Sequence, residues 1–213
     1  MRIGVPKETA DNETRVAIVP VSIPKLKKLG FDVIIQEGAG KLSGYSDSEY
    51  TEKGAQIGKL DEVMSNELIA SINIPDYKIM KKGQMLACIA DPFRNLEQTK
   101  EIIDAGITLL SLEVIPRRLS KGQSMDVNSS QDNLSGYKAA LMGSQHIAKM
   151  VPMMMTSAGT VRPAKFIIQG AAVAGLQAIA TAKRLGAAVQ AIDVRLAAKQ
   201  DTESLGAKFI DVP

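Results

Sequence analysis

Apolar and polar positions alternate along the first half of the chain with two different periods. Short apolar runs, typical of buried strands, are separated by stretches that carry apolar residues at helical spacing. The expected strands are residues 2–5, 31–35, 68–74, 84–90 and 106–114. The expected helices are residues 21–29, 46–55, 59–65 and 95–106. This order predicts βαβ units, and therefore an α/β fold with a parallel sheet.

A second alternation follows a longer break in the pattern. Residues 129–150 have apolar side chains at helical spacing, and residues 151–165 are rich in Pro, Gly and small residues. We expect the latter stretch to connect two domains, with the triplet Met153–Met155 packing as flexible core. From Phe166 to Asp193 the pattern is strand, glycine turn, helix and second strand.

The composition narrows the possible functions without selecting one. The 213 residues carry a net charge of +3, and the basic residues are scattered, so no nucleic-acid surface is expected. Cys88 and His146 are the only cysteine and histidine, which argues against a zinc site and for a reducing compartment. No apolar stretch reaches the roughly 20 residues that cross a bilayer.

The glycine turn carries the most specific chemistry in the sequence. A dinucleotide turn uses its first glycine for the bend, its second for approach to the pyrophosphate and its third for helix packing. Here Gly170 and Gly175 fill the first and third positions, whereas Ala172 adds a methyl group at the second. Asp193 ends the next strand at the spacing of the acid that binds the ribose hydroxyls and repels a 2′-phosphate. The turn therefore predicts NAD binding; the alternative is a structural βαβ turn that binds nothing.

A polar stretch at residues 113–137 follows the last strand of the first domain. Gln123, Asp126, Ser129 and Ser130 can point from it toward one ligand. Clefts between domains are common ligand sites, but Ser and Asn are also ordinary turn formers. A ligand loop and an ordinary surface loop both remain open on these residues.

Several segments in order resemble the alanine dehydrogenase / pyridine nucleotide transhydrogenase family. They are "MRIGVPKE", "NETRVA", "IPR", "QSMDVNSSQ", "GYKA", "PMMMTSAGTV", "GAAVAGLQAIATAKRLGA" and "DVR". The resemblance implies two Rossmann-like parallel-sheet domains, the second inserted into the first, with NAD in the cleft between them. We expect an N-terminal domain over residues 1–135, a connecting helix and linker over 136–163, and a partial NAD-binding domain over 164–213.

The resemblance also implies roles for individual residues. Arg118, Gln123 and Asp126 match a loop that presents Arg, Gln and Asp to the nicotinamide, although Arg117 competes with Arg118 for the first place. Ser129 matches a serine near the same ring. The segments expected to contact the pyrophosphate and the adenosine ribose are Ala171, Ala172, Val173 and Asp193, Val194, Arg195.

The match is closest to the NAD(H)-binding alpha subunit of proton-translocating transhydrogenase. An alanine dehydrogenase needs an early Arg, which Arg15 matches, together with a Lys and a His that "SINIPD" and "ACIADP" lack. Reduction of an oxo acid without a cationic clamp and a proton donor is chemically poor, whereas hydride exchange between two nicotinamides needs neither.

The transhydrogenase interpretation implies partners. NADP(H) is then bound on a partner subunit, membrane-spanning subunits couple hydride transfer to proton movement, and the chain is cytoplasmic, peripheral at the inner membrane face, and a homodimer. Because the sequence stops at Pro213 after "KFIDV", we expect the second domain to be truncated. The alternatives are an alanine-dehydrogenase-like amino acid oxidoreductase and a non-catalytic remnant.

Overall fold

The chain folds as two compact units in a computed structural model that describes residues 1–116 and 120–211. The first unit is Met1–Met125 and the second is Asp126–Pro213. The domain boundary expected near residue 135 stays a prediction. Arg117 and Arg118 lie outside the described residues.

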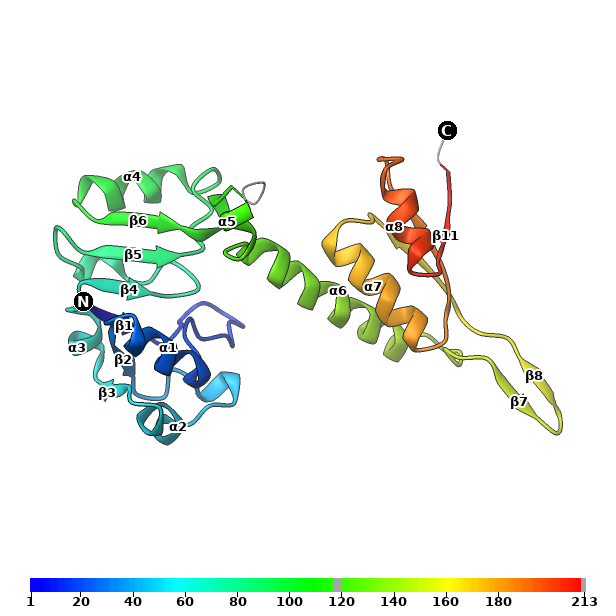
Figure 1. The fold of residues 1–213 in the computed structure, drawn as a ribbon, viewed down its shortest axis with the longest axis horizontal. Helices are drawn as coiled ribbons and strands as arrows, with labels where there is room; N and C mark the ends of the chain where they lie inside the picture. The colour runs from blue at the N-terminus through cyan, green and yellow to red at the C-terminus, as the bar shows by residue number, and fades with distance from the viewer. Residues whose placement is uncertain (117–119, 212–213) are drawn as a thin grey trace. The chain divides into compact units, whose positions relative to one another are not determined.

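A six-stranded parallel sheet forms the centre of the first unit (Figure 1). Its strands are β1 (Arg2–Val5), β2 (Asp32–Gln36), β3 (Gln56–Gly58), β4 (Leu68–Ala70), β5 (Met85–Cys88) and β6 (Thr108–Ser111). They lie in the order β3-β2-β1-β4-β5-β6, so the chain reverses direction across the sheet between β1 and β4. Five of the strands were expected from the sequence. β3 was not, because three residues are too few for a period to be read.

Short helices connect these strands. They are α1 (Ile23–Lys28), α2 (Asp47–Glu52), α3 (Leu60–Met64), α4 (Leu96–Asp104) and α5 (Ser120–Gln123), with single 3-10 turns η1 (Pro20–Ser22), η2 (Lys41–Ser43), η3 (Tyr77–Ile79) and η4 (Leu112–Val114). The start of α2 shows why a helix forms there: the Ser46 hydroxyl accepts from the Glu49 N–H, and the Glu49 carboxylate accepts from the Ser46 N–H.

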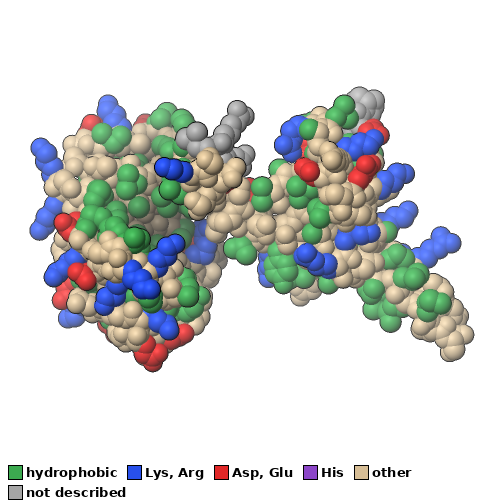
Figure 2. All heavy atoms as spheres, viewed as in Figure 1, with side chains coloured by type: hydrophobic (Ala, Val, Ile, Leu, Met, Phe, Trp, Pro, Cys, Tyr) green, Lys and Arg blue, Asp and Glu red, His purple; other side chains and the backbone are tan. Residues whose placement is uncertain are grey.

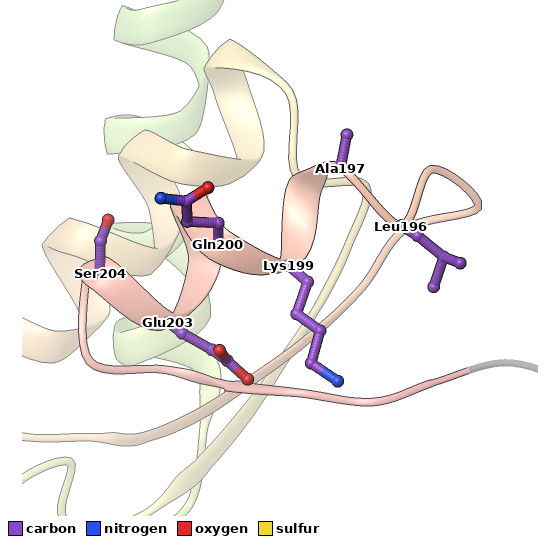
Figure 3. A pocket seen from close by; sticks show the side chains of 6 residues that line it. All are labelled: Leu196, Ala197, Lys199, Gln200, Glu203 and Ser204. Carbon is purple, nitrogen blue, oxygen red and sulfur yellow. The ribbon is translucent and has the colours of Figure 1, made fainter.

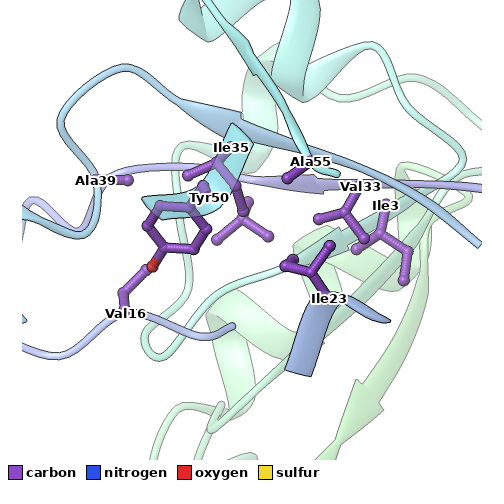
Figure 4. Packing of buried hydrophobic residues seen from close by; sticks show 9 residues of the cluster. Ile3, Val16, Ile23, Val33, Ile35, Ala39, Tyr50 and Ala55 are labelled. Carbon is purple, nitrogen blue, oxygen red and sulfur yellow. The ribbon is translucent and has the colours of Figure 1, made fainter. Parts of the chain in front are cut away.

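The core of the first unit is aliphatic with one buried tyrosine (Figure 4). Ile23, Ile35 and Tyr50 are fully buried, and the Tyr50 hydroxyl donates to the Ile18 carbonyl at 2.9 Å. Cys88 is buried in the neighbouring cluster, and burial raises the pKa of its thiol to about 12. Cys88 is thus a small core residue, as expected, and not a reactive thiolate.

The second unit is a half-sized sheet with helices packed on it (Figure 1). Its elements are α6 (Val127–His146), β7 (Met154–Thr156), β8 (Gly159–Val161), β9 (Lys165–Gln169), α7 (Val173–Arg184), β10 (Ala188–Ile192), α8 (Ala198–Ser204) and β11 (Lys208–Phe209). β9, β10 and β11 form a parallel sheet in the order β11-β10-β9. Two parallel-sheet units agree with the expected fold class of Rossmann-like domains.

α6 and α7 pack along a seam of small side chains. Ala140 is buried in a cluster with Ala178, Ile179 and Ala182 of α7. Gly136 lies so close to α7 that an added Cβ would stand 2.0 Å from the Ala174 carbonyl oxygen. Such small-residue contacts bring the two helix backbones closer than larger side chains allow.

The hairpin β7–β8 overturns the expectation that the methionine triplet packs in a core. Met153, Met154 and Met155 are 58%, 40% and 78% exposed, and within the described residues the two strands pair with each other alone. Figure 2 shows hydrophobic side chains along this hairpin. The sequence pattern misled because three consecutive methionines read the same in a buried connection and in an exposed ribbon.

Neither a bilayer-spanning helix nor a metal cluster occurs in residues 1–116 and 120–211. No helix there is long and apolar enough to cross a membrane. No group of three His, Cys, Asp or Glu side chains there is placed to hold a metal ion.

Candidate functional site

The glycine turn after β9 has the backbone geometry that its sequence predicts. Gly170 has φ +89°, a conformation that side chains with a Cβ rarely adopt, and its N–H donates to the Ile192 carbonyl at 2.8 Å. A Cβ at Gly175 would lie 1.7 Å from the Gly170 carbonyl oxygen. Glycine is therefore required at both positions, once for the bend and once for the close approach of helix and turn.

The start of α7 offers amides without helical acceptors to an anion. The first helical bond runs from the Leu176 N–H to the Ala172 carbonyl at 2.8 Å, so the amides of the preceding turn have no acceptor within the helix. The N-cap residue Ala172 caps no amide with its side chain, and the first turn has no acidic residue. The positive end of the helix dipole is thus open to a negative group such as a diphosphate.

Ala172 does not strain this turn. Its φ of −87° is accessible to any residue, and its methyl group is exposed. The sequence raised the question of whether alanine at the middle position prevents the bend, and the backbone shows that it does not. The remaining effect of the methyl group is steric, on a ligand that approaches the amides.

Asp193 ties the turn to the end of β10. Its Oδ2 accepts from the Ala171 N–H at 2.7 Å, and its Oδ1 accepts from the Arg195 N–H at 2.8 Å. The Arg195 guanidinium donates to both oxygens at 3.0 Å. Although only 6% of its side chain is exposed, Asp193 is fully partnered, and the bonds from Arg195 and then Ala171 hold its pKa well below the usual range.

These contacts give Asp193 a structural role that the motif spacing did not predict. The spacing indicated an acid near a ribose, but the order "DVR" also places an Arg two residues later, which could have revealed the ion pair. Arg195 is 59% exposed at its side chain, and Val194 is 94% exposed. The acid therefore stays charged at neutral pH beside an accessible guanidinium.

The polar stretch before the second unit is mostly helical rather than a loop. Asp126 is the N-cap of α6, where its Oδ1 accepts from the Ser129 N–H at 2.9 Å and its Oδ2 from the Ser129 hydroxyl at 2.6 Å. These two predicted site residues are thus brought together. Gln123 is exposed at the end of α5 in the first unit, and Arg118 lies outside the described residues.

A polar cluster that the sequence pattern did not predict lies in the first unit. The Glu13 carboxylate accepts from Arg15 Nε at 2.8 Å and Nη2 at 2.6 Å, and from Asn73 Nδ2 at 3.1 Å. The bonds from Arg15 lower the pKa of Glu13 to about 2. Asn73 also donates to Glu8 and lines a cleft of about 230 Å³ between the loops after β1 and β4.

A larger hollow of about 560 Å³ lies along the outer face of α8 (Figure 3). Its lining residues are Leu196, Ala197, Lys199, Gln200, Glu203 and Ser204. Lys199 also contacts Asp211 at 3.2 Å. None of the residues predicted to bind NAD lines this hollow, so it is separate from the glycine turn.

Comparison with known proteins places both halves of the chain in one family. The family model described as "Alanine dehydrogenase/PNT, N-terminal domain" matches residues 4–135, and "Alanine dehydrogenase/PNT, C-terminal domain" matches residues 139–213. Together they cover almost the whole chain, which confirms the resemblance found in the sequence motifs.

Individual relatives favour the transhydrogenase branch. The chain is 43% identical to the first portion of the split NAD(P) transhydrogenase subunit alpha of Rhodospirillum rubrum, over 100% of this chain and 58% of the relative. It is 38% identical to NAD(P) transhydrogenase subunit alpha of Haemophilus influenzae, over 100% of this chain and 42% of the relative. Identity to alanine dehydrogenase of Mycobacterium tuberculosis is lower, at 29% over 92% of this chain and 54% of the relative.

The solved structures agree. The transhydrogenase structure from Sinorhizobium meliloti matches with a TM-score of 0.95 at 45% identity, over 100% of this chain and 62% of that chain. The chain spans only 58% of the Rhodospirillum relative, so it corresponds to a portion of that protein. With two family models matched in order, the chain belongs to the alanine dehydrogenase/PNT family.

Proposed function

We propose that this chain is the NAD(H)-binding portion of an NAD(P) transhydrogenase alpha subunit. In this role it passes hydride between NADH and NADP⁺ held on a partner subunit. The observation that carries the proposal is the glycine turn, in which Gly170 and Gly175 are required and the amides at the start of α7 are open to a diphosphate. Similarity to transhydrogenase alpha subunits supports the same assignment.

The residues of the second unit divide the work of binding. The amides from Ala172 onward hold the pyrophosphate, together with Ala171 and Val173 beside them. Asp193, with Val194 and Arg195, lies at the adenosine ribose. Asp193 also fixes the turn through the Ala171 N–H, so it orients the amides as well as selecting the ribose.

The residues expected at the nicotinamide act by position rather than by acid–base chemistry. Bound NADH supplies the hydride. Gln123, Asp126 and Ser129, with Arg118, would hold the carboxamide so that the ring faces its acceptor, and exclusion of water would protect the hydride. The Asp126–Ser129 pair supports this, because its hydrogen bonds hold both side chains at one helix start.

The first unit argues against oxo-acid chemistry. Arg15 already binds a carboxylate, that of Glu13, through two guanidinium nitrogens. A bidentate carboxylate fills the guanidinium fork that a substrate acid would need. The segments "SINIPD" and "ACIADP" supply neither a lysine nor a histidine nearby. The alanine dehydrogenase alternative therefore lacks its clamp.

Partners follow from the same proposal. NADP(H) would be bound by a partner subunit, and membrane-spanning subunits would hold the chain at the cytoplasmic face of a membrane. A homodimer is supported by the hairpin β7–β8, because an isolated two-stranded ribbon with Met155 78% exposed is poorly stable alone. Methionines adapt well to a partner surface.

Nucleotide choice tests the role of Asp193. We expect NADH to bind more tightly than NADPH, and Asp193→Asn to reduce that preference by about tenfold or more, because the carboxylate repels a 2′-phosphate placed beside it. Fluorescence titration of each nucleotide measures the ratio. Asp211→Asn removes an equal charge next to Lys199 and should leave the ratio unchanged. An Asp193→Asn ratio equal to that of the wild type would contradict the assignment, and a wild type that binds neither would favour a non-catalytic remnant.

Ala172→Gly tests the steric effect at the turn. Removing the exposed methyl group should strengthen NADH binding, by about 1–3 kcal/mol if the methyl group now displaces the pyrophosphate, the range seen for overpacked contacts. Isothermal titration calorimetry gives the difference directly. Ala174→Gly removes a methyl group two residues further along α7 and serves as the control. Unchanged or weaker binding by Ala172→Gly would show that the pyrophosphate does not approach this position.

Hydride acceptors separate the two enzymatic alternatives. With the NADP-binding partner subunit added, we expect the chain to support hydride transfer from NADPH to an NAD analogue, followed by the absorbance of the reduced analogue. With pyruvate and ammonia replacing the partner, NADH should not be consumed, because Glu13 occupies Arg15. NADH oxidation that depends on pyruvate would instead favour an amino acid oxidoreductase.

The hairpin tests the homodimer. We expect the wild-type chain to sediment as a dimer and Met155→Asp to sediment as a monomer, because burying an unpaired carboxylate at an apolar contact is costly. Val21→Asp places the same charge at a residue of similar exposure, 77% against 78%, in the first unit, and should remain dimeric. A monomeric wild type, or a dimeric Met155→Asp, would contradict this interface.

A further inference from the structure

We propose that Gly136 is a positioning residue for the nicotinamide end of the dinucleotide. By allowing α6 to lie directly against the start of α7, it would fix where Asp126 and Ser129 stand relative to the glycine turn. This inference rests on the proposed function. It adds a residue that touches no ligand and that the turn motif does not include.

The contact at Gly136 is between backbones and cannot be relieved by a side-chain rotation. An ideal Cβ on Gly136 would lie 2.0 Å from the Ala174 carbonyl oxygen, 2.8 Å from its carbon and 3.0 Å from its Cα. Ala174 is the second residue of α7 and belongs to the turn that carries the open amides. The closest approach of the two helices is therefore at the site itself, and any side chain at residue 136 forces the helices apart.

The two helices run in the same direction, so the start of α6 extends past the start of α7 (Figure 1). Gly136 contacts Ala174 at the start of α7, whereas Gly143, further along α6, faces the Phe166 ring at the beginning of β9. The nine residues from Val127 to Ser135 precede the Gly136 contact and span roughly 13 Å at helical rise. Asp126 therefore stands beyond the carboxyl edge of the sheet, on the side where Gly170 turns.

The first turn of α6 is fixed to the helix that bears it. Asp126 accepts from the Ser129 N–H and hydroxyl at 2.9 Å and 2.6 Å, so both side chains move with the helix axis. A displacement of α6 at Gly136 is thus carried to this pair. The bonds that shape the glycine turn, from Ala171 to Asp193 and from Gly170 to Ile192, involve no residue of α6. The two ends of the site can consequently be changed separately.

A comparison of ADP and NADH on the full chain tests this separation. ADP carries the pyrophosphate and adenosine ribose but no nicotinamide. For Gly136→Ala we expect NADH to bind about tenfold more weakly while ADP stays within about twofold of the wild type, because small misplacements of positioning groups cost binding at that end only. NADH is followed by its fluorescence and ADP by calorimetry.

Gly143→Ala is the matched control. It makes the same substitution on the same helix with the same gain in helix propensity, but its Cβ meets only the Phe166 ring edge at 3.3 Å. Both ligands should bind within about twofold of the wild type, as expected for a contact that a small shift relieves. If Gly136→Ala does not fold by circular dichroism, Ala140→Val enlarges the same seam one turn later and should give the same selective loss.

Each other outcome overturns the inference. Equal loss of ADP and NADH would make Gly136 a purely structural residue, and unchanged binding would remove it from the site. Wild-type affinities that are equal for ADP and NADH would mean that no group positions the nicotinamide, while the turn still binds as proposed. A wild type that binds neither ligand would contradict the proposed function itself, and the inference with it.

Discussion

The close contact between the Gly170 carbonyl and Gly175 is the constraint on which the second unit depends. It presses the start of α7 onto the end of β9, leaving no room for a Cβ at Gly175. That pressure aims the first amides of α7 at the carboxyl edge of the sheet, where Asp193 holds the Ala171 N–H. A helix start that is uncapped and free of acids would be an unexplained cost in a protein that bound no anion.

The two units differ in which charged group remains accessible, and this difference suggests how the family's two chemistries diverge on one scaffold. The anion site of the second unit is open, because its amides lack partners within the helix. The cationic site of the first unit is closed, because Glu13 accepts from Arg15 and from Asn73. A protein with this pair can hold a dinucleotide without holding an acid substrate. The absence of lysine and histidine in the adjoining segments is consistent with that closure.

The sequence was enough to predict what depends on local chemistry. Gly170 and Gly175 have a fixed spacing and a stated geometric need, so the turn and its flanking elements followed, as did most strands of the first sheet. What could not be predicted depends on contacts across the chain. The exposed methionines and the Glu13–Arg15–Asn73 cluster follow from tertiary placement, which no single-sequence period encodes. Asp193 shows the limit most clearly, because spacing identified it but indicated only one of its two roles.

Asp193 also explains why an alanine can stand at the middle of the turn. In a dinucleotide turn the second glycine is needed for approach of the ligand, whereas the bend itself needs only the first. Here the bend is secured independently, by the left-handed Gly170 and by the bond from Ala171 to Asp193. Ala172 therefore adopts an ordinary φ of −87° and changes the surface rather than the path of the chain. A turn fixed from both sides can vary its ligand-facing residue and tune affinity without losing its fold.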